Sequence, residues 1–151
     1  MAKQPSALAV NRRARFDYEI LERFEAGIEL LGHEVKSAKA GRCNLSGSFV
    51  HIRENEAWLT NATIAPYAKA SGLDGYVPTR SRRLLLKRAE IRRLIGKHGA
   101  EHLTIIPLAV AVRHGLVKVE LAIARGKKQY EKRETIKRRE DERRMRNAKM
   151  R

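Results

Sequence analysis

The sequence lacks the marks of a secreted or membrane protein. Its one cysteine, Cys43, excludes an internal disulfide and suits a reducing compartment such as the cytoplasm. No apolar run approaches the roughly 20 residues that a membrane-spanning helix needs. The N-terminal region offers only the short apolar run 7–10, so we expect neither a signal peptide nor a membrane segment.

Catalytic and metal-binding motifs are also missing. The histidines are scattered, and Gly99 interrupts any helical face that His98 and His102 could share. Cys43 is better explained as a small half-buried side chain than as a nucleophile. No phosphate-binding GxxxxGK motif is present. The sequence therefore predicts no metal, no cofactor and no catalytic residue, and we expect that the protein is not an enzyme.

Acidic residues are scarce relative to basic ones. The 151 residues include 33 Lys or Arg against 17 Asp or Glu, which gives a formal net charge of +16. Such an excess of positive charge indicates an anionic partner, which could be a nucleic acid, an acidic protein or an anionic membrane.

Half of this excess lies at the C-terminus. Residues 125–151 contain 13 Lys or Arg and five Asp or Glu, a net charge of +8, and few large aliphatic side chains. A segment with so little to bury cannot offset its own ordering entropy, and without Trp or Phe it gains little from a membrane surface. Ion pairs such as Glu134 with Arg138 favour a helix, but nucleation is costly. We expect a basic tail that is disordered alone and becomes helical on a polyanion such as RNA.

The first half of the chain alternates between expected strands and a short helix. Apolar residues at even positions over 16–30 favour a long strand with an irregularity near Glu22 and a bend at Gly27, although part of the spacing also fits a helix. A short helix is expected over 32–41, followed by a hairpin over 49–64. The aperiodic, glycine-containing stretch that follows, 66–78, is expected to be a loop.

The second half has the clearest patterns. Residues 87–98 fit an amphipathic helix, whereas leucines 84–86 could begin that helix or form a brief strand. Residues 103–112 and 116–124 are typical of two strands joined by a tight hairpin, with Pro107 at an edge or a bulge. In the second of these strands, one face carries Val117, Val119, Leu121 and Ile123.

These elements predict a mainly β fold with short helices. Because the connections are mostly of hairpin length, the sheet should be largely antiparallel. At this size, a small β-barrel of the oligonucleotide-binding type with flanking helices removes exposed sheet edges and suits a basic protein. The expected organisation is a disordered N-terminal lead over residues 1–10, an RNA-binding β-barrel domain over 11–126 and the basic C-terminal tail over 127–151.

Several motifs, in one order along the chain, resemble those of a known family. They are NRRAR at 11–15, FEAG at 24–27, GHEVKS at 32–37, TRSRRLLL at 79–86 and ARGKK at 124–128. From Asn11 to the end, the chain is similar to the bacterial SsrA-binding proteins, the small protein B partners of transfer-messenger RNA. Two positions depart from the usual pattern, because Glu131 stands where the family commonly has Asp and Ser81 where it commonly has Thr.

The resemblance implies a barrel that binds the tRNA-like domain of transfer-messenger RNA, with no covalent chemistry of its own. It also implies a role in trans-translation, in which the complex enters stalled ribosomes, the stalled peptide is tagged and the ribosome is released. The implied partners are therefore transfer-messenger RNA, the ribosome at its small-subunit decoding site and message channel, and elongation factor Tu through the RNA complex.

The resemblance also implies which residues contact RNA. Arg12 and Lys36 suit phosphate contacts, whereas a carboxylate in an RNA site accepts from base amino groups or ribose hydroxyls, or orients a neighbouring arginine. For the tRNA-like domain, the implied residues are Asn11, Arg12, Glu25, Glu34, Lys36, Leu85 and Lys87.

A second implied set lies in the tail and would contact the ribosome. Tyr130 suits stacking on a ribosomal base, a contact worth roughly 1–3 kcal/mol. The full set is Gly126, Lys127, Lys128, Tyr130, Glu131, Lys132 and Arg133.

Two other functions stay open on the residues alone. A small basic ribosomal or ribosome-assembly protein would bind ribosomal RNA permanently, whereas an adaptor would join ribosomes transiently. A nuclease or RNA-modifying enzyme would turn over its substrate.

Overall fold

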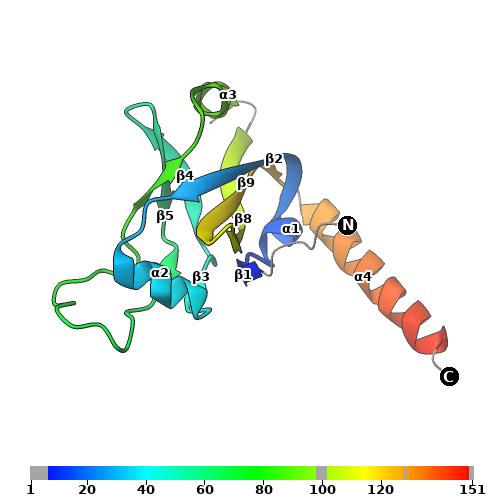
Figure 1. Ribbon diagram of the computed structural model, residues 1–151. Helices are drawn as coiled ribbons and strands as arrows, with labels where there is room; N and C mark the ends of the chain where they lie inside the picture. The colour runs from blue at the N-terminus through cyan, green and yellow to red at the C-terminus, as the bar shows by residue number, and fades with distance from the viewer. Residues whose placement is uncertain (1–6, 98–101, 128, 150–151) are drawn as a thin grey trace.

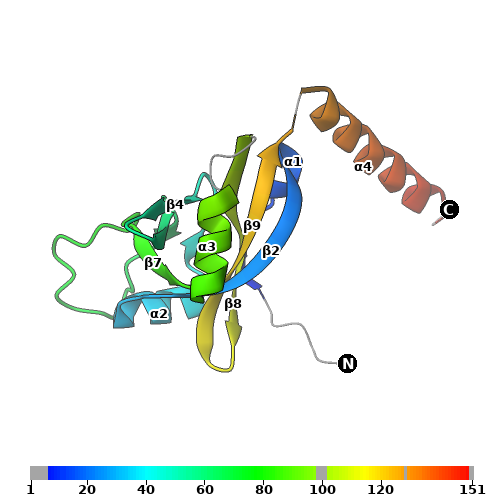
Figure 2. The same cartoon turned by 90° about the horizontal axis from the view of Figure 1, so that it is seen from above.

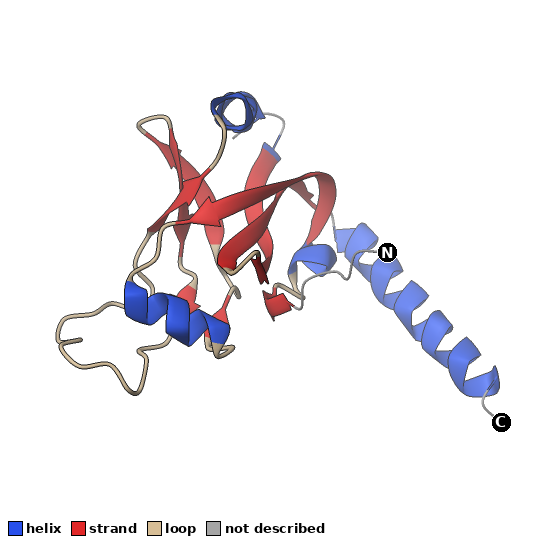
Figure 3. Cartoon of the chain, in the orientation of Figure 1, coloured by secondary structure: helices blue, strands red, loops and turns tan. Residues whose placement is uncertain are grey.

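The computed structural model describes residues 7–97, 102–127 and 129–149, which form a barrel with helices at its periphery (Figures 1 and 3). The elements, in chain order, are β1 (Ala7–Val10), α1 (Ala14–Asp17), β2 (Tyr18–Ile28), α2 (Gly32–Lys39), β3 (Cys43–Asn44), β4 (Phe49–Arg53), β5 (Glu56–Thr60), β6 (Thr63–Ile64), β7 (Arg82–Leu85), α3 (Arg88–Lys97), β8 (Leu103–Arg113), β9 (Leu116–Gly126) and α4 (Gln129–Lys149).

The main sheet closes on itself. Strands β8, β4, β5, β7, β2 and β9 follow one another, each antiparallel to the next, and β9 pairs again with β8. Closure leaves few edges exposed, as expected for a small barrel. The predicted mainly β fold is confirmed, and the closed ring is compatible with the oligonucleotide-binding type.

Two predicted irregularities occur in the long strands. The pairing of β2 with β9 shifts between Ile20 and Glu22, and that of β8 with β9 shifts between Pro107 and Ala109. The tight hairpin between β8 and β9 is also confirmed, because His114 and Gly115 both have positive φ, of 52° and 77°. The shift at Ile20–Glu22 lets β2 curve around the barrel beside β9 (Figure 2).

The sequence left open whether leucines 84–86 begin a helix or form a brief strand. In the structure, Leu84 and Leu85 belong to the strand β7. Arg82 and Leu84 face inward and are buried, whereas Leu85 is 46% exposed. α3 begins only at Arg88, where the backbone N–H of Lys87 donates to the Glu90 carboxylate at 3.1 Å. In this contact, a glutamate in the first turn of the helix caps the backbone N–H of the residue that precedes the helix.

Side chains of the expected inward face form the core. Val117, Val119, Leu121 and Ile123 are all buried within one cluster. On the opposite face of β9, Ala122 and Ala124 are buried as well, because α1 covers them and forms a smaller cluster around Ala14. A small residue on the polar face of β9 therefore marks where a helix lies against the outside of the barrel.

The expected disordered lead over residues 1–10 is wrong for residues 7–10. These residues form β1, which pairs with Ala109–Ala111 of β8, and Leu8 and Ala9 pack against the core. β8 is longer than β4, so its second half would be an open edge without β1. Residues 1–6 lie outside the described residues.

The tail also differs from the expectation of disorder. Residues 129–149 form the helix α4, which projects away from the barrel in both views (Figures 1 and 2). Its described side chains are exposed, including Ile136 at 42% and Met145 at 67%. Good helix formers and opposite charges spaced four residues apart in the sequence, rather than packing, favour this helix.

Candidate RNA-binding surface

Five of the seven residues implied for the tRNA-like domain lie along one side of the barrel, on or beside the outward face of β2 and β9. We call this group the β2 face. Glu34 and Lys36 lie elsewhere, on α2, at the end of the barrel opposite α3 (Figure 1). The β2 face consists of Asn11, Arg12, Glu25, Leu85 and Lys87.

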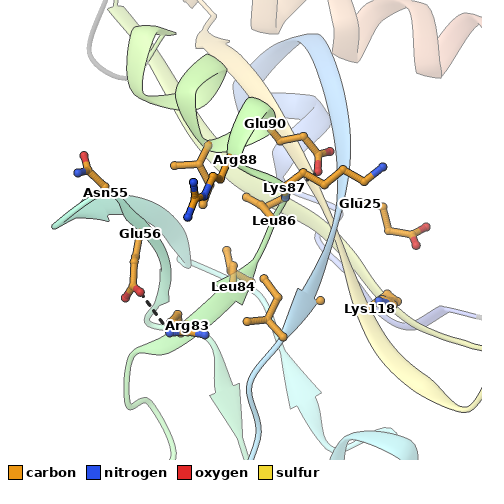
Figure 4. Close-up of a pocket in the computed structure, with 13 residues that line it drawn as sticks. Glu25, Asn55, Glu56, Arg83, Leu84, Leu86, Lys87, Arg88, Glu90 and Lys118 are labelled. Carbon is orange, nitrogen blue, oxygen red and sulfur yellow. Dashed lines mark hydrogen bonds and ion pairs between the residues drawn. The ribbon is translucent and has the colours of Figure 1, made fainter.

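A hollow at one end of this face, shown in Figure 4, has Leu85 among the residues that line it. Gly27 lies directly opposite Leu85 in the ladder, and a Cβ at Gly27 would stand 3.2 Å from the Leu85 Cβ. The glycine therefore leaves room for Leu85 to lie over β2. Lys87 and Lys118 also line the hollow (Figure 4), so it combines an exposed apolar side chain with two cations.

Glu25 does not stand as a free carboxylate in this hollow. Its Oε2 lies 2.8 Å from Arg113 Nη1, and both side chains are about half exposed. This pairing matches the second role expected of a carboxylate in an RNA site, which is to orient a neighbouring arginine.

The other end of the β2 face is built around Asn11. The Asn11 side chain donates from Nδ2 to the Pro107 carbonyl at 3.0 Å, and its backbone N–H donates to Leu108 at 2.8 Å. Asn11 thus fixes the chain at the bulge of β8. Arg12 is exposed immediately afterwards and lines a second hollow with Arg23, whose Nη1 lies 3.2 Å from the Glu120 carboxylate.

Glu34 contradicts the expectation of a direct RNA contact, because its side chain is fully buried. Its carboxylate accepts from Arg82 Nε at 2.8 Å, from Tyr76 Oη at 2.8 Å and from both Nε and Nη2 of Arg80. It also caps its own helix by accepting from the Leu31 backbone N–H at 2.8 Å. We call Glu34, Tyr76, Arg80 and Arg82 the Glu34 hub.

Competing effects set the charge of Glu34. Burial by itself raises the pKa of this carboxyl group, but hydrogen bonds from Arg80, the Leu31 backbone, Arg82 and Tyr76 outweigh it and lower the pKa to about 2. The carboxylate is therefore ionised at neutral pH and holds two guanidinium groups. Its effect on any RNA contact must pass through these neighbours.

Sequence reasoning did not single out Arg82, which is the largest fully buried side chain. Besides Glu34, its guanidinium donates to the carbonyls of Ala62, Pro78 and Arg80 at 2.9–3.0 Å. Its position two residues before the buried Leu84 was the available signal, since alternate residues of a strand share a face. A run of arginines normally indicates a solvated surface, so the pattern of charges offered no reason to expect that Arg82 would be buried.

Lys36 is exposed on α2, with its Nζ 5.9 Å above the ring centre of Tyr67. It is not among the side chains that line the hollows beside Leu85 and Arg12.

The implied tail residues lie at the junction of β9 and α4 and along the start of α4. Gly126 ends β9, and the Lys127 backbone N–H donates to the Asp17 carbonyl at 2.8 Å, which ties the exit of the barrel to α1. Arg133 is exposed. Tyr130, Glu131 and Lys132 belong to α4, and Lys128 lies outside the described residues.

Other chemistry finds little support in the described part of the chain. Within residues 7–97, 102–127 and 129–149, no three His, Cys, Asp or Glu side chains come together as a metal site would require. Cys43 is half-buried against the core, and burial raises the pKa of its thiol, which disfavours the nucleophilic thiolate. None of the described helices is long and apolar enough to cross a membrane.

Comparison with known proteins gives consistent matches over nearly the whole chain. The family described as SmpB protein matches residues 8–151. The SsrA-binding protein of Trichodesmium erythraeum is 54% identical over 138 residues, which cover 91% of this chain and 88% of that protein. The SsrA-binding protein of Thermosynechococcus vestitus is 47% identical over 148 residues, covering 98% and 97% of the two chains.

A solved structure agrees with these sequence matches. A chain from the structure described as "tmRNA-SmpB: a journey to the center of the bacterial ribosome" is 50% identical and superimposes with a TM-score of 0.67. The match covers 80% of this chain and 84% of that one. On the family match and these relatives together, the chain belongs to the SmpB family of SsrA-binding proteins.

Proposed function

We propose that this protein is an RNA-binding adaptor that binds transfer-messenger RNA and delivers it to stalled ribosomes in trans-translation. The observation that carries the proposal is the family match over residues 8–151, together with a structural relative described with transfer-messenger RNA and the bacterial ribosome. The net charge of +16 supports an RNA partner.

The β2 face is the part of the barrel best suited to the tRNA-like domain. It combines exposed cations with the exposed Leu85, and RNA recognition commonly joins phosphate contacts to apolar contacts with splayed bases. Arg12 and Lys87 neutralise phosphates, Leu85 packs against a base or ribose, and Glu25 holds Arg113 toward the RNA.

The tail supplies the ribosome contact. α4 carries its charge on exposed side chains and has little packing to the barrel, so it is free to enter the empty message channel as a helix. The residues from Gly126 to Arg133 would then lie at the decoding site. Elongation factor Tu joins through the RNA complex, and the cytoplasm is the compartment in which these partners meet. The protein itself performs no covalent chemistry.

Sequencing the RNA that co-purifies with the protein tests this function directly. Transfer-messenger RNA should dominate, whereas ribosomal RNA alone would instead favour a permanent ribosomal or assembly protein. Intact RNA after incubation with the protein and a divalent metal would dismiss a nuclease.

Truncation after Gly126 tests the division between barrel and tail. Affinity for the tRNA-like domain should stay near normal while peptide tagging is lost, because the five residues of the β2 face all precede Gly126 and α4 adds only Arg139 to the described lining of the hollow beside Arg12. A large loss of affinity would refute the division. Binding by the full chain should weaken by about 0.7–0.9 log units per log unit of salt for each phosphate neutralised.

A further inference from the structure

The tail helix contributes one residue to a hollow of the barrel. Arg139 of α4 is among the residues that line the hollow beside Arg12. The other lining residues come from β1, β2, β8, β9 and the segment between β1 and α1. α4 otherwise projects away from the barrel (Figures 1 and 2). The hollow is therefore a place where one ligand can touch the barrel and the tail at once.

Guanidinium groups dominate the charge of this hollow. Arg12, Arg23 and Arg139 line it together with one carboxylate, that of Glu120. Arg23 Nη1 lies 3.2 Å from the Glu120 carboxylate, which offsets one positive charge. Arg12 and Arg139 take part in no ion pair among the described residues. Two positive charges, one from the barrel and one from the tail, are thus left for an anion.

The barrel side of the hollow is held in place by backbone pairing. β1 pairs with β8 as far as Val10. Asn11 then binds the bulge of β8, through its backbone N–H to Leu108 at 2.8 Å and through its side chain to Pro107 at 3.0 Å. Arg12 follows directly in the sequence, so it extends from a fixed point of the barrel.

The tail side is tied to the barrel at its root. The Lys127 backbone N–H donates to the Asp17 carbonyl at 2.8 Å, and α4 begins at Gln129. The described side chains of α4 are exposed, so packing does little to set the direction of the helix. The like charges of Arg12 and Arg139 disfavour a close approach of α4 when no anion lies between them. An anion that binds both groups would reverse this effect.

We propose that a phosphate of the RNA on the β2 face lies between Arg12 and Arg139 and thereby fixes the direction of the tail helix. We call this place the Arg12–Arg139 site. Guanidinium groups suit it, because they donate to phosphate oxygens in a fixed fork. The inference rests on the proposed adaptor function and deepens it. Through this site, the RNA-bound barrel presents its tail in one orientation before the tail meets the ribosome.

Orienting the helix early favours the later contact with the ribosome. A helix that samples many directions loses that freedom when it enters the message channel, whereas an oriented helix has less to lose. Linkage also requires that the tail strengthen RNA binding by the same factor by which RNA favours the oriented tail. Because both guanidinium groups are exposed, this factor should be small, about twofold. Most of the RNA affinity therefore stays with the barrel.

Distances between a barrel label and a tail label test the site in the full-length protein. Spin labels are attached at Ser46→Cys and Asn147→Cys, two exposed positions outside the hollow, in a Cys43→Ala background. Pulsed electron spin resonance gives the distribution of label distances with and without a saturating transcript of the tRNA-like domain. Otherwise unaltered protein should show a narrower distribution with the transcript. A distribution that stays equally broad would overturn the site.

Arg139→Ala removes the tail half of the site. Its matched control is Arg138→Ala, which removes the same charge from the preceding residue, outside the lining of the hollow. With saturating transcript, Arg139→Ala should keep a broad distribution, whereas Arg138→Ala should narrow as the unaltered protein does. The slope of log affinity against log salt should fall by about 0.7–0.9 in Arg139→Ala, as for one phosphate contact, and should not change in Arg138→Ala. Equal effects in the two variants would mean that the charge of the tail acts without a defined site.

Arg139→Glu tests the site without RNA. A carboxylate at position 139 pairs with Arg12 in place of the phosphate, so the distribution should narrow at low salt in the absence of transcript. Adding Arg12→Ala should abolish this narrowing. Arg138→Glu introduces the same charge one residue earlier and should leave the distribution broad. If Arg139→Glu and Arg138→Glu gave the same distribution, the site would be refuted.

Two outcomes separate this inference from the proposed function. If the unaltered protein does not bind the transcript, the adaptor function fails, and the RNA phosphate proposed for the site fails with it. If the protein binds the transcript while the variants at Arg139 and Arg138 behave alike, the Arg12–Arg139 site is refuted and the adaptor function stands.

Discussion

Ionisation of Glu34 should make the stability of the barrel depend on pH in the acid range. The hub lowers the pKa of Glu34 from 4.5 to about 2 in the folded protein. Because the folded pKa lies below the unfolded one, the stabilisation is fully present above about pH 4.5 and is lost as the pH falls from there through 2. A difference of about 2.5 pKa units corresponds to about 3 kcal/mol of unfolding free energy.

Urea unfolding at pH 7, 5 and 3, followed by the fluorescence of the single tryptophan, Trp58, measures this loss. The variant Glu34→Gln supplies the comparison, since its side chain cannot titrate. At pH 7 it leaves the buried Arg82 without a counter-ion, which costs about 3–5 kcal/mol. The gap in unfolding free energy between wild type and variant should therefore shrink as the pH falls toward 3.

Glu25→Gln is the matched control, because it removes a carboxylate from an exposed ion pair with Arg113. An exposed pair contributes about 0–1 kcal/mol, so this variant should stay close to wild type at every pH. A gap for Glu34→Gln that keeps one size from pH 7 to pH 3 would refute the reasoning. In the wild type, the NMR titration of the Glu34 carboxyl carbon checks the depressed pKa directly.

Three further predictions concern the core, the hollow and the thiol. Leu121→Ala should cost about 2–5 kcal/mol in urea unfolding, since Leu121 is fully buried in the core; a loss below about 1 kcal/mol would contradict this. Gly27→Val should lower transcript affinity about tenfold. A Cβ at position 27 would stand 3.2 Å from the Leu85 Cβ, so the larger side chain of valine would displace Leu85. Unchanged affinity would show that Leu85 is not part of the site. At pH 8, a thiol reagent should label Cys43 slowly until urea is added, and rapid labelling of the folded protein would contradict its raised pKa.

Most of the barrel could be predicted because its strands carry local signals. Alternation in β9 identified the buried face, and Pro107 indicated the bulge. β1 could not be predicted in this way. Its four residues have no periodicity of their own, and they become a strand only because β8 offers an unpaired edge far along the chain.

The site divides in the same manner. The family resemblance assigned Arg12 and Leu85 to the RNA-binding surface, and both side chains are exposed in the structure, as such a role requires. The burial of Glu34 could not be predicted, because it depends on Arg80 and Arg82, which lie 46 and 48 residues further along the chain. Sequence patterns show the charge of a side chain, whereas only the fold shows whether another charge has already paired with it.

The composition of the loop between β6 and β7 explains why the ionic Glu34 hub, rather than an apolar cluster, holds it. Residues 66–80 contain few large aliphatic side chains, and one of these, Val77, is 53% exposed. An apolar contact there would not fix the position of the loop backbone, because the hydrophobic effect is not directional. The Arg82 guanidinium instead donates in fixed directions to Glu34 and to the carbonyls of Ala62 and Pro78, and so sets the path of the backbone. A buried pair of this kind adds little net stability over an apolar one, but its directed hydrogen bonds specify a single path for the loop.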